Sequence, residues 1–185
     1  MGEDLTADMT RKFLESDTLL LRAMEMEDLD FLYGIENDSE NWDVSNLTVP
    51  YSHHFLSQYI QGASNDMFAD RQMRLIACLK EDGRPIGTVD LTDFSPMHRH
   101  AEVGVAFLKE CRGKGYGKTA LQLLEDYAFT FLHLKHLTAR MLEDNKPSLS
   151  LFSALEYAPV GTLHNWWLTP EGYKDVTVLE KVRAD

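Results

Sequence analysis

Glycines alternate with cationic and aromatic side chains over residues 112–118, where the sequence reads Arg-Gly-Lys-Gly-Tyr-Gly-Lys. This stretch follows an apolar run, Val103 to Leu108, and leads into a long amphipathic run, Ala120 to Leu134. The pattern predicts a strand that is joined to a helix by a loop over residues 108–118. Glycines leave the backbone N–H groups of such a loop unshielded, beside the positive end of the helix dipole and three cationic side chains. We therefore predict an anion site that suits a phosphate group.

The spacing of the glycines separates three phosphate-binding motifs. Gly117-Lys118-Thr119 matches the end of a P-loop, but that motif requires a glycine five positions before Gly117, where this chain has Arg112. Gly115-x-Gly117-x-x-Ala120 satisfies the dinucleotide fingerprint. A dinucleotide-binding domain usually begins with repeated parallel crossovers, whereas an antiparallel meander is expected before this loop. The third motif is Arg112-x-x-Gly115-x-Gly117.

The elements that position the loop can be read from the periodicity of the apolar residues. Strands are expected over residues 18–22, 74–79, 85–91, 101–108, 136–142, 160–168 and 176–182, and helices over residues 26–37, 50–65, 120–134 and 147–155. Ser52 is the expected cap of the second helix. Residues 1–15 are expected to form a loose arm or a short helical lead-in, and residues 37–50 a loop anchored by Trp42 and Val44. The predicted order is β-α-α-β-β-β-α-β-α-β-β, a mixed α/β (α+β) fold with helices on both faces of one sheet.

Composition and charge bound the class of protein. A length of 185 residues with 44% hydrophobic residues suits one core, so we expect a single domain over residues 1–185. The formal net charge of −12 argues against nucleic-acid binding, because affinity for a phosphate backbone rests on clustered Lys and Arg. No apolar run is long enough to span a membrane, and no signal-peptide core is present. With only Cys78 and Cys111, and no metal-ligand pattern among the histidines, we expect a cytoplasmic protein without a metal.

The third motif, Arg112-x-x-Gly115-x-Gly117, resembles the acyl-CoA pyrophosphate loop of the GCN5-related N-acetyltransferases (the GNAT superfamily). In that family the loop lies between a strand and the long helix, and the predicted element order is similar to the family's order. The likeness covers roughly residues 18–182 and extends to Asn145 and the helix after it. Leu21-Arg22, Asp28-Leu29 and the glycine loop look most like the ribosomal-protein and spermidine acetyltransferases.

The resemblance implies which residues hold acetyl-CoA. Backbone groups from Arg112 to Lys118 would cradle the pyrophosphate, and Phe107 and Leu108 would pair with the pantetheine amide as a strand does. Asn145 and Phe152 would lie beside the pantetheine arm. In the family, the strand that carries the loop splays from the next strand, and the acyl thioester lies in the gap. The implied cofactor-binding residues are Phe107, Leu108, Arg112, Gly113, Lys114, Gly115, Tyr116, Gly117, Lys118, Asn145 and Phe152.

Direct acetylation of an amine requires a group that accepts the ammonium proton. Glu102 is the first candidate for this base, because it lies on the strand that runs into the loop and shares a strand face with Gly104 and Ala106. A salt-bridged or solvated strand carboxylate is the alternative role for Glu102. Asp90 and Asp93 have similar claims from the neighbouring strand.

The acid that protonates the leaving thiolate is less evident. Many members of the family use a tyrosine at the position where this chain has Phe152. Tyr157 is the nearby phenol and the candidate acid, with a buried packing role as the alternative. Because a thiolate is a tolerable leaving group, transfer can also proceed without a dedicated acid, with proximity supplying much of the acceleration.

The first helix and the loop after it, which face the acceptor in this family, are acidic. Their acidic residues are Glu25, Glu27, Asp28, Asp30, Glu36, Asp38, Glu40 and Asp43. A polycationic acceptor is one consequence of this charge, and an ordinary solvated helix face is the other interpretation.

We therefore expect an acetyl-CoA-dependent N-acetyltransferase that acts on a primary amine, either a polyamine such as spermidine or a protein N-terminus. A non-catalytic acyl-CoA-binding module is the alternative, since Phe152 removes the usual acid, and a dinucleotide-binding protein is the third hypothesis. The sequence leaves the oligomeric state open, with a homo-oligomer among the options.

Overall fold

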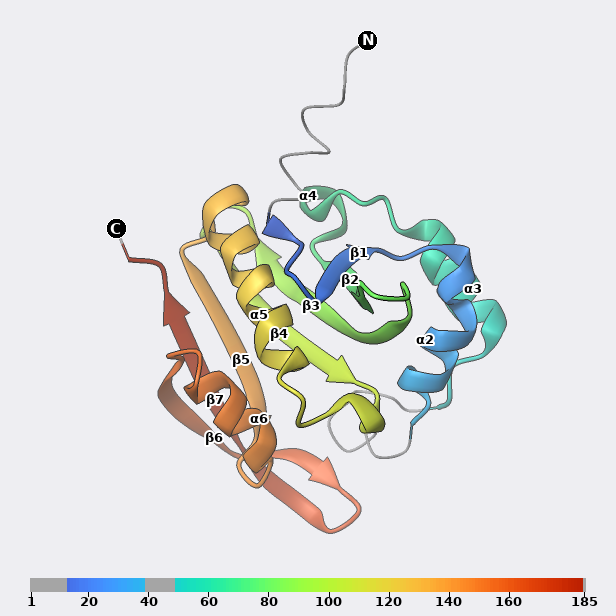
Figure 1. The fold of residues 1–185 in the computed structure, drawn as a ribbon. Coiled ribbons are helices and arrows are strands. Elements are labelled where there is room, and N and C mark those ends of the chain that lie inside the picture. Colours follow the sequence, from blue (N-terminus) through green and yellow to red (C-terminus); the bar gives the residue numbers. More distant parts are fainter. Residues whose placement is uncertain (1–12, 39–48, 185) are drawn as a thin grey trace.

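The described strands form one mixed sheet in the computed structural model, which describes residues 13–38 and 49–184 (Figure 1). The strands are β1 (Leu19–Ala23), β2 (Met73–Leu79), β3 (Pro85–Ser95), β4 (His100–Phe107), β5 (His136–Leu142), β6 (Ala158–Thr169) and β7 (Gly172–Val182). Their order across the sheet is β1-β2-β3-β4-β5-β7-β6. Neighbours in this described sheet pair antiparallel, except β4 and β5, which are parallel. The pattern confirms the predicted mixed fold class.

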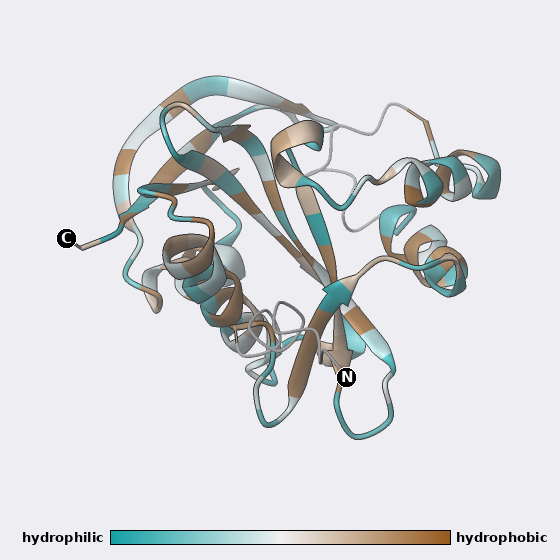
Figure 2. Cartoon of the chain, turned by 90° about the horizontal axis from the view of Figure 1, so that it is seen from above, coloured by the Kyte–Doolittle hydropathy of each residue, from teal (hydrophilic) through white to brown (hydrophobic). Residues whose placement is uncertain are grey.

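Helices cover both faces of this sheet, as Figure 2 shows from above. The helices are α2 (Leu29–Glu36), which follows a 3₁₀ turn (Met26–Asp28), α3 (His53–Gly62), α4 (Met67–Asp70), α5 (Tyr116–Asp126), which continues into a π-helical turn (Tyr127–Phe131), and α6 (Lys146–Ser153). Along β2, Leu75, Ala77 and Leu79 belong to the core that includes α5, whereas Ile76 and Cys78 pack with α2 and α3. Because neighbouring strand residues point to opposite faces, one continuous apolar strand serves both layers. None of the described helices has the length and apolar character needed to cross a membrane.

The short helix α4 is absent from the predicted elements. It has a single turn, which apolar periodicity cannot reveal because a repeat needs at least two turns to be visible. Its N-terminal signal is local: the Asp66 side chain accepts hydrogen bonds from the N–H groups of Phe68 and Ala69, at 2.8 and 3.4 Å. Ser52 caps α3 as predicted and accepts a hydrogen bond from the Phe55 N–H at 3.1 Å.

Helix α5 begins earlier than its apolar pattern suggests. Gly115 is its N-cap residue, with a left-handed φ of 86°, so residues 116–118 form the first helical turn and are not part of the loop. Glycine adopts this conformation without steric cost. The loop itself is reduced to a 3₁₀ turn (Lys109–Cys111) and residues 112–115.

Two sets of predictions fall on residues that the structure does not describe. The arm over residues 1–12 lies outside the described residues, as do the loop anchors Trp42 and Val44.

Candidate functional site

Strands β4 and β5 pair over a short length and then separate. The described pairs are His100 with His136, Ala101 with Leu137, and Glu102 with Thr138, although both strands continue beyond them. A cleft of about 240 Å³ opens between the separated ends, with residues of α6 and β6 also in its wall. Its lining residues are Glu102, Val103, Gly104, Val105, Ala139, Arg140, Met141, Leu142, Asn145, Ser148, Phe152 and Trp167. The predicted splay is therefore present.

The glycine loop at the end of β4 carries consecutive unpaired backbone donors. The six N–H groups from Gly113 to Lys118 donate no hydrogen bond within the described residues, and the first helical bond runs from Thr119 N–H to the Gly115 carbonyl at 3.1 Å. Gly113 and Gly115 have φ values of 72° and 86°, and a Cβ added at either would meet nothing within 4 Å. Unpaired donors beside open space at a helix N-terminus fit a phosphate or a pyrophosphate.

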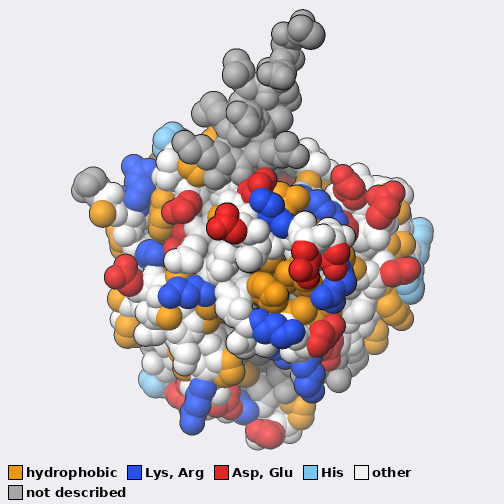
Figure 3. Space-filling view, in the orientation of Figure 1, with side chains coloured by type: hydrophobic (Ala, Val, Ile, Leu, Met, Phe, Trp, Pro, Cys, Tyr) orange, Lys and Arg blue, Asp and Glu red, His pale blue; other side chains and the backbone are white. Residues whose placement is uncertain are grey.

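Cationic side chains surround this loop without forming a broad basic surface. Arg112 ties the loop to β4, because its Nε donates to the Phe107 carbonyl at 2.9 Å. Lys114 and Lys118 are exposed beside it. Over the face seen in Figure 3, Lys and Arg side chains are interspersed with Asp and Glu. Such a local cluster suits a small phosphorylated ligand better than a polymer.

Phe107, the last residue of β4, points its backbone N–H toward the edge of β4 that faces the cleft. Leu108 donates its N–H to the Ile86 carbonyl of β3 at 3.0 Å. Since successive amide groups of a strand point to opposite edges, the Phe107 amide faces the edge from which β5 has separated. The Phe107 ring lies over Gly87, where an added Cβ would come within 2.6 Å of a ring carbon. The Phe107 N–H is therefore available to a ligand, whereas its carbonyl already accepts from Arg112.

Glu102 lies at the last β4–β5 pair and lines the cleft. Its side chain is 20% exposed, and its Oε2 accepts a hydrogen bond from Nε of Arg140 at 2.6 Å. Nη2 of Arg140 also donates to Oδ2 of Asp93 at 2.9 Å. The hydrogen bond with Glu102 raises the pKa of Arg140 above its ordinary value. The salt-bridged role considered for Glu102 is thus realised, at a position where the residue still lines the cleft.

A second ion-pair network lies on the same face of the neighbouring strands. Arg74 donates to both carboxylate oxygens of Asp90, at 2.7 and 3.0 Å, and to Oε1 of Glu36 at 2.6 Å. Burial alone would lower the pKa of Arg74, but the two carboxylates raise it above its ordinary value. A Cβ added at Gly104 would lie 3.4 Å from Oδ2 of Asp90. Because both its oxygens accept from Arg74, Asp90 is a weaker candidate for the base than Glu102.

Two predicted cofactor residues of α6 and its cap lie in the cleft wall. Asn145 caps the helix, since its Oδ1 accepts a hydrogen bond from the Ser148 N–H at 3.2 Å. Phe152 is buried and presents an apolar ring without a hydroxyl. Their contact with a pantetheine arm stays a prediction.

Tyr157, the predicted acid, is not among the residues that line the cleft. It is buried, and its hydroxyl makes no hydrogen bond within the described residues. Burial raises the pKa of Tyr157, and the nearby Glu125 carboxylate adds to the effect. Glu125 itself is buried and accepts a hydrogen bond from Nζ of Lys181 at 2.6 Å. This geometry favours the packing role that the sequence left as the alternative for Tyr157.

Arg140 and Trp167 line the cleft although the sequence-based prediction did not single them out, whereas Ser148 belongs to the helix that was expected beside the pantetheine arm. Arg140 is a lone charge in an apolar strand, and that signal alone marked it as unusual. Trp167 lies on the described edge strand β6, so nothing in its local pattern indicates the distant cleft. Within residues 13–38 and 49–184, no group of three or more His, Cys, Asp or Glu side chains could hold a metal ion.

The acidic first helix is partly structural. Asp28 is buried and accepts hydrogen bonds from both Nη atoms of Arg22, at 2.7 and 2.8 Å. Glu36 is turned toward the Arg74 network. Glu40 and Asp43 lie outside the described residues. The solvated-face interpretation therefore fails for Asp28 and Glu36.

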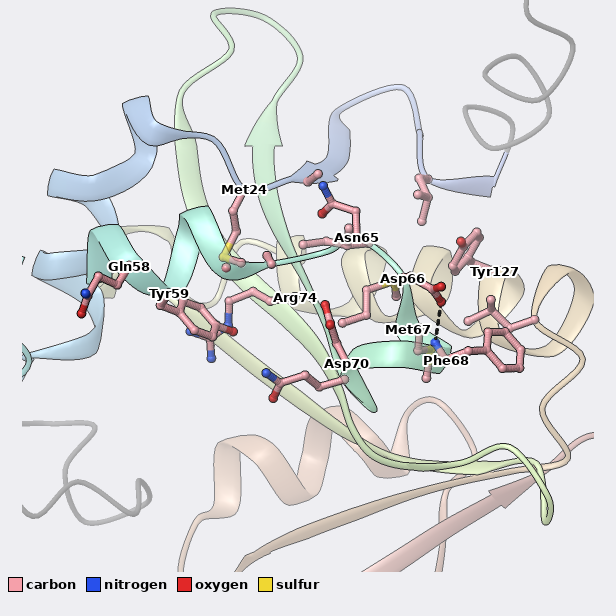
Figure 4. Close-up of a pocket in the computed structure, with 18 residues that line it drawn as sticks. Met24, Gln58, Tyr59, Asn65, Asp66, Met67, Phe68, Asp70, Arg74 and Tyr127 are labelled. Carbon is pink, nitrogen blue, oxygen red and sulfur yellow. Dashed lines mark hydrogen bonds between the residues drawn. The ribbon is translucent and has the colours of Figure 1, made fainter. Parts of the chain in front are cut away.

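A larger cavity, of about 760 Å³, lies among α3, α4, the adjoining ends of β1 and β2, and the π-helical turn (Figure 4). It shares no lining residue with the cleft in the described part of the chain. Two of its charged groups serve the fold: Arg74 is bound by two carboxylates, and Asp66 caps α4. The residues suited to acyl-transfer chemistry lie in the smaller cleft.

Most of the chain is similar to known acetyltransferases. The family model described as an acetyltransferase (GNAT) domain matches residues 18–157. The uncharacterized N-acetyltransferase p20 of Bacillus licheniformis is 30% identical over 154 residues, which make up 83% of this chain and 86% of that protein. The spermidine N(1)-acetyltransferase of Vibrio cholerae is 24% identical over 160 residues, or 85% of this chain and 89% of that protein.

Solved structures share the fold. The spermidine N-acetyltransferase of Vibrio cholerae, in complex with CoA and spermine, matches with a TM-score of 0.80 and 24% identity, covering 90% of this chain and 96% of that chain. A dodecameric structure of that enzyme matches with a TM-score of 0.76 and 24% identity, covering 90% and 95%. At this identity the likeness shows the fold alone.

Proposed function

Because this chain belongs to the GNAT acetyltransferase family, it is an N-acetyltransferase, and we propose that it transfers the acetyl group of acetyl-CoA directly to a primary amine. Family membership favours an enzyme over the non-catalytic binding module. The dinucleotide hypothesis loses support as well, because β4 and β5 are the one parallel pair in the described sheet and repeated parallel crossovers are missing there.

The six unpaired N–H groups from Gly113 to Lys118, at the end of a strand that has separated from its neighbour, carry this proposal. They offer donors for a pyrophosphate, and the Phe107 N–H offers one donor for an amide carbonyl next to it. From Phe107 back to Glu102, β4 spans about 17 Å at roughly 3.4 Å per residue, a length that an extended pantetheine arm can follow. Acetyl-CoA held in this way supplies an activated acetyl thioester.

Glu102 is the group that we assign to accept a proton from the acceptor ammonium. Its Oε1 has no hydrogen bond within the described residues, so it can take the proton directly or through water. As the acetyl carbonyl carbon forms its bond to nitrogen, the bond to sulfur breaks and a thiolate leaves. Phe152 offers no acidic proton and Tyr157 does not line the cleft, which supports release without a dedicated acid.

The charge beside the cleft supports a cationic acceptor. Four carboxylates, those of Glu36, Asp90, Asp93 and Glu102, are paired with two guanidinium groups in the networks described above. The excess of negative charge favours an amine with further positive charges, so a polyamine such as spermidine is our first choice and a protein N-terminus the second. Spermidine is also the substrate in the name of the Vibrio cholerae relative.

We extend the proposal to assembly and compartment. The dodecameric relative supports a homo-oligomer for this chain. Cys78 and Cys111 are both buried and free, which is consistent with a reducing compartment such as the cytoplasm.

Thiol release from acetyl-CoA tests the function with spermidine, a peptide with an unblocked N-terminus and an aminoglycoside as acceptors. We expect turnover with spermidine, and mass spectrometry should find one acetyl group on a primary amine. Faster turnover with the peptide than with spermidine would mean that the acceptor is a protein N-terminus and not a polyamine. CoA binding without turnover of any amine would contradict amine acetylation.

A further inference from the structure

We propose that Arg140 is a positioning residue for the transfer, which clamps the point where β4 and β5 separate and holds Glu102 by one carboxylate oxygen. The second oxygen is thereby left for the acceptor amine. This role rests on the proposed function, in which Glu102 accepts the ammonium proton.

The clamp lies at the first place where the two strands are no longer paired. Backbone pairing between β4 and β5 ends at Glu102 and Thr138. Arg140 follows Thr138 by two residues and so lies on the same face of β5. Its side chain reaches back across the opening gap to Glu102, with Nε 2.6 Å from Oε2. The Arg140–Glu102 ion pair thus connects the two strands just beyond their last backbone pair.

The contact uses a single oxygen of Glu102. Both Nε and Nη2 of Arg140 lie against Oε2, whereas Oε1 receives no hydrogen bond within the described residues. Two N–H groups of the rigid guanidinium against one atom hold Oε2 in place, and because the side chain is also tethered to β4, they limit where Oε1 can lie. Glu102 is therefore oriented and still has one oxygen that can accept a proton.

Asp93 holds the guanidinium from the other side. Its Oδ2 accepts a hydrogen bond from Nη2 of Arg140 at 2.9 Å. Asp93 has a left-handed φ of 50°, inside the irregular stretch of β3 between Thr92 and Ser95. The side chain of Asp93 is 72% exposed, so the ion pair by itself stabilises the fold little. Aspartate adopts a left-handed conformation more readily than most residues, and the irregular stretch of β3 brings its carboxylate to Arg140.

The rest of the cleft wall carries no charge that could replace this contact. Among the described residues that line the cleft, Arg140 is the one cation and Glu102 the one anion. The other nearby guanidinium, that of Arg74, is bound by Asp90 and Glu36. Loss of Arg140 would therefore leave Glu102 without an orienting partner at the mouth of the splay.

A kinetic double-mutant cycle tests the role, with Arg140→Gln, Glu102→Gln and the double variant measured over a range of acetyl-CoA concentrations at saturating spermidine. We expect Arg140→Gln to lower kcat by about tenfold, the size of effect typical of a lost orienting partner, while the KM for acetyl-CoA changes by less than about twofold. The loss should disappear in the Glu102→Gln background, because Arg140 acts through Glu102. Arg140→Lys should recover part of kcat, since it restores the charge without the fork.

Arg84→Gln is the matched control, because Arg84 is exposed and pairs with Asp82 away from the cleft. It should leave kcat unchanged. Urea unfolding shows whether each variant is folded. If Arg140→Gln does not fold, the kcat of Asp93→Asn and of Arg140→Lys is compared with that of the wild type instead. Additive losses in the cycle, or an unchanged kcat in Arg140→Gln, would overturn the positioning role. Wild-type turnover reports on the proposed function and the cycle on Arg140, so the two failures are distinguishable.

Discussion

Phe152 and Tyr157 meet edge to face, with ring centroids 4.9 Å apart and ring planes at 89°. Phe152 lines the cleft, whereas Tyr157 does not and instead lies near the buried Glu125. Tyr157 therefore lies next to a cleft residue, but its own side chain does not line the cleft. This relationship separates the two roles that the sequence left open for Tyr157.

Replacement of Tyr157 by phenylalanine should leave kcat unchanged, because the hydroxyl is outside the cleft lining. The same change removes a buried hydroxyl that makes no hydrogen bond within the described residues but interacts with the buried Glu125 carboxylate, so the free energy of unfolding should change by less than about 1 kcal/mol. Urea unfolding and steady-state kinetics measure the two effects. Tyr127→Phe serves as the control for loss of a tyrosine hydroxyl elsewhere. A fall in kcat of about tenfold or more would restore Tyr157 as the acid.

Replacement of Gly115 by valine should weaken CoA binding by at least about tenfold. Gly115 has a left-handed φ of 86°, which a β-branched residue adopts only at a cost, and the side chain would enter the space in front of the unpaired N–H groups. Isothermal titration with CoA measures the affinity. Gly161→Val is the control, since Gly161 has no left-handed backbone and equally open surroundings. Retained affinity in the Gly115 variant would remove the loop from the CoA site.

Glu102→Gln should lower kcat for amine acetylation by about 10²- to 10⁴-fold if Glu102 is the base, while CoA affinity stays the same. The amide keeps the size of the side chain but cannot accept the ammonium proton. The loss should be largest below the pKa of the acceptor amine, where more of the amine is protonated. Rates across pH with spermidine measure it, and Glu81→Gln in the exposed β2–β3 turn is the control. Superimposable pH–rate profiles for wild type and variant would rule out the base role.

Asp28→Asn should lower the free energy of unfolding by about 2 kcal/mol at about pH 7, because it weakens a buried, charge-assisted pair with Arg22. Burial alone would raise the pKa of Asp28, but hydrogen bonds from Arg22 and from the Glu25 N–H hold it below its ordinary value. A lowered folded-state pKa means that the contribution is complete above the ordinary Asp pKa of about 3.9 and is lost as the pH falls through the folded-state value.

The difference between wild type and Asp28→Asn should accordingly shrink on acidification. Urea unfolding at about pH 7 and about pH 3 measures it. Asp17→Asn is the control, since Asp17 is exposed at the start of β1. A difference that stays constant between the two pH values would show that the Asp28 charge does not contribute to stability.

Local patterns were sufficient for most of the fold. The apolar periodicity predicts each of the described strands and the long helices, because burial on one or two faces dictates where apolar side chains recur. The one-turn helix α4 was missed, since a single turn has no repeat. The start of α5 was placed too late because its first turn, Tyr116, Gly117 and Lys118, contains a glycine and a lysine and so shows no apolar repeat.

The row of unpaired backbone donors was equally readable from sequence, since the donors belong to consecutive residues and Gly113 and Gly115 mark left-handed conformations. The cleft was not readable in the same way. Arg140 and Trp167 come from β5 and β6, and only the register of β4 against β5 and the path of the last hairpin bring them to Glu102.

The sequence by itself determined the family, the order of the elements and the glycine loop that we propose for acetyl-CoA, because each depends on residues close together along the chain. Only the tertiary structure decided the partners of the charged side chains. In the folded protein Glu102 forms an ion pair with Arg140, Asp90 with Arg74 and Asp28 with Arg22. The Tyr157 ring packs edge to face against Phe152. The physical reason is that a charge is neutralised by whichever opposite charge the packed strands bring within a few ångströms, and that neighbour is set by register and splay, not by local pattern.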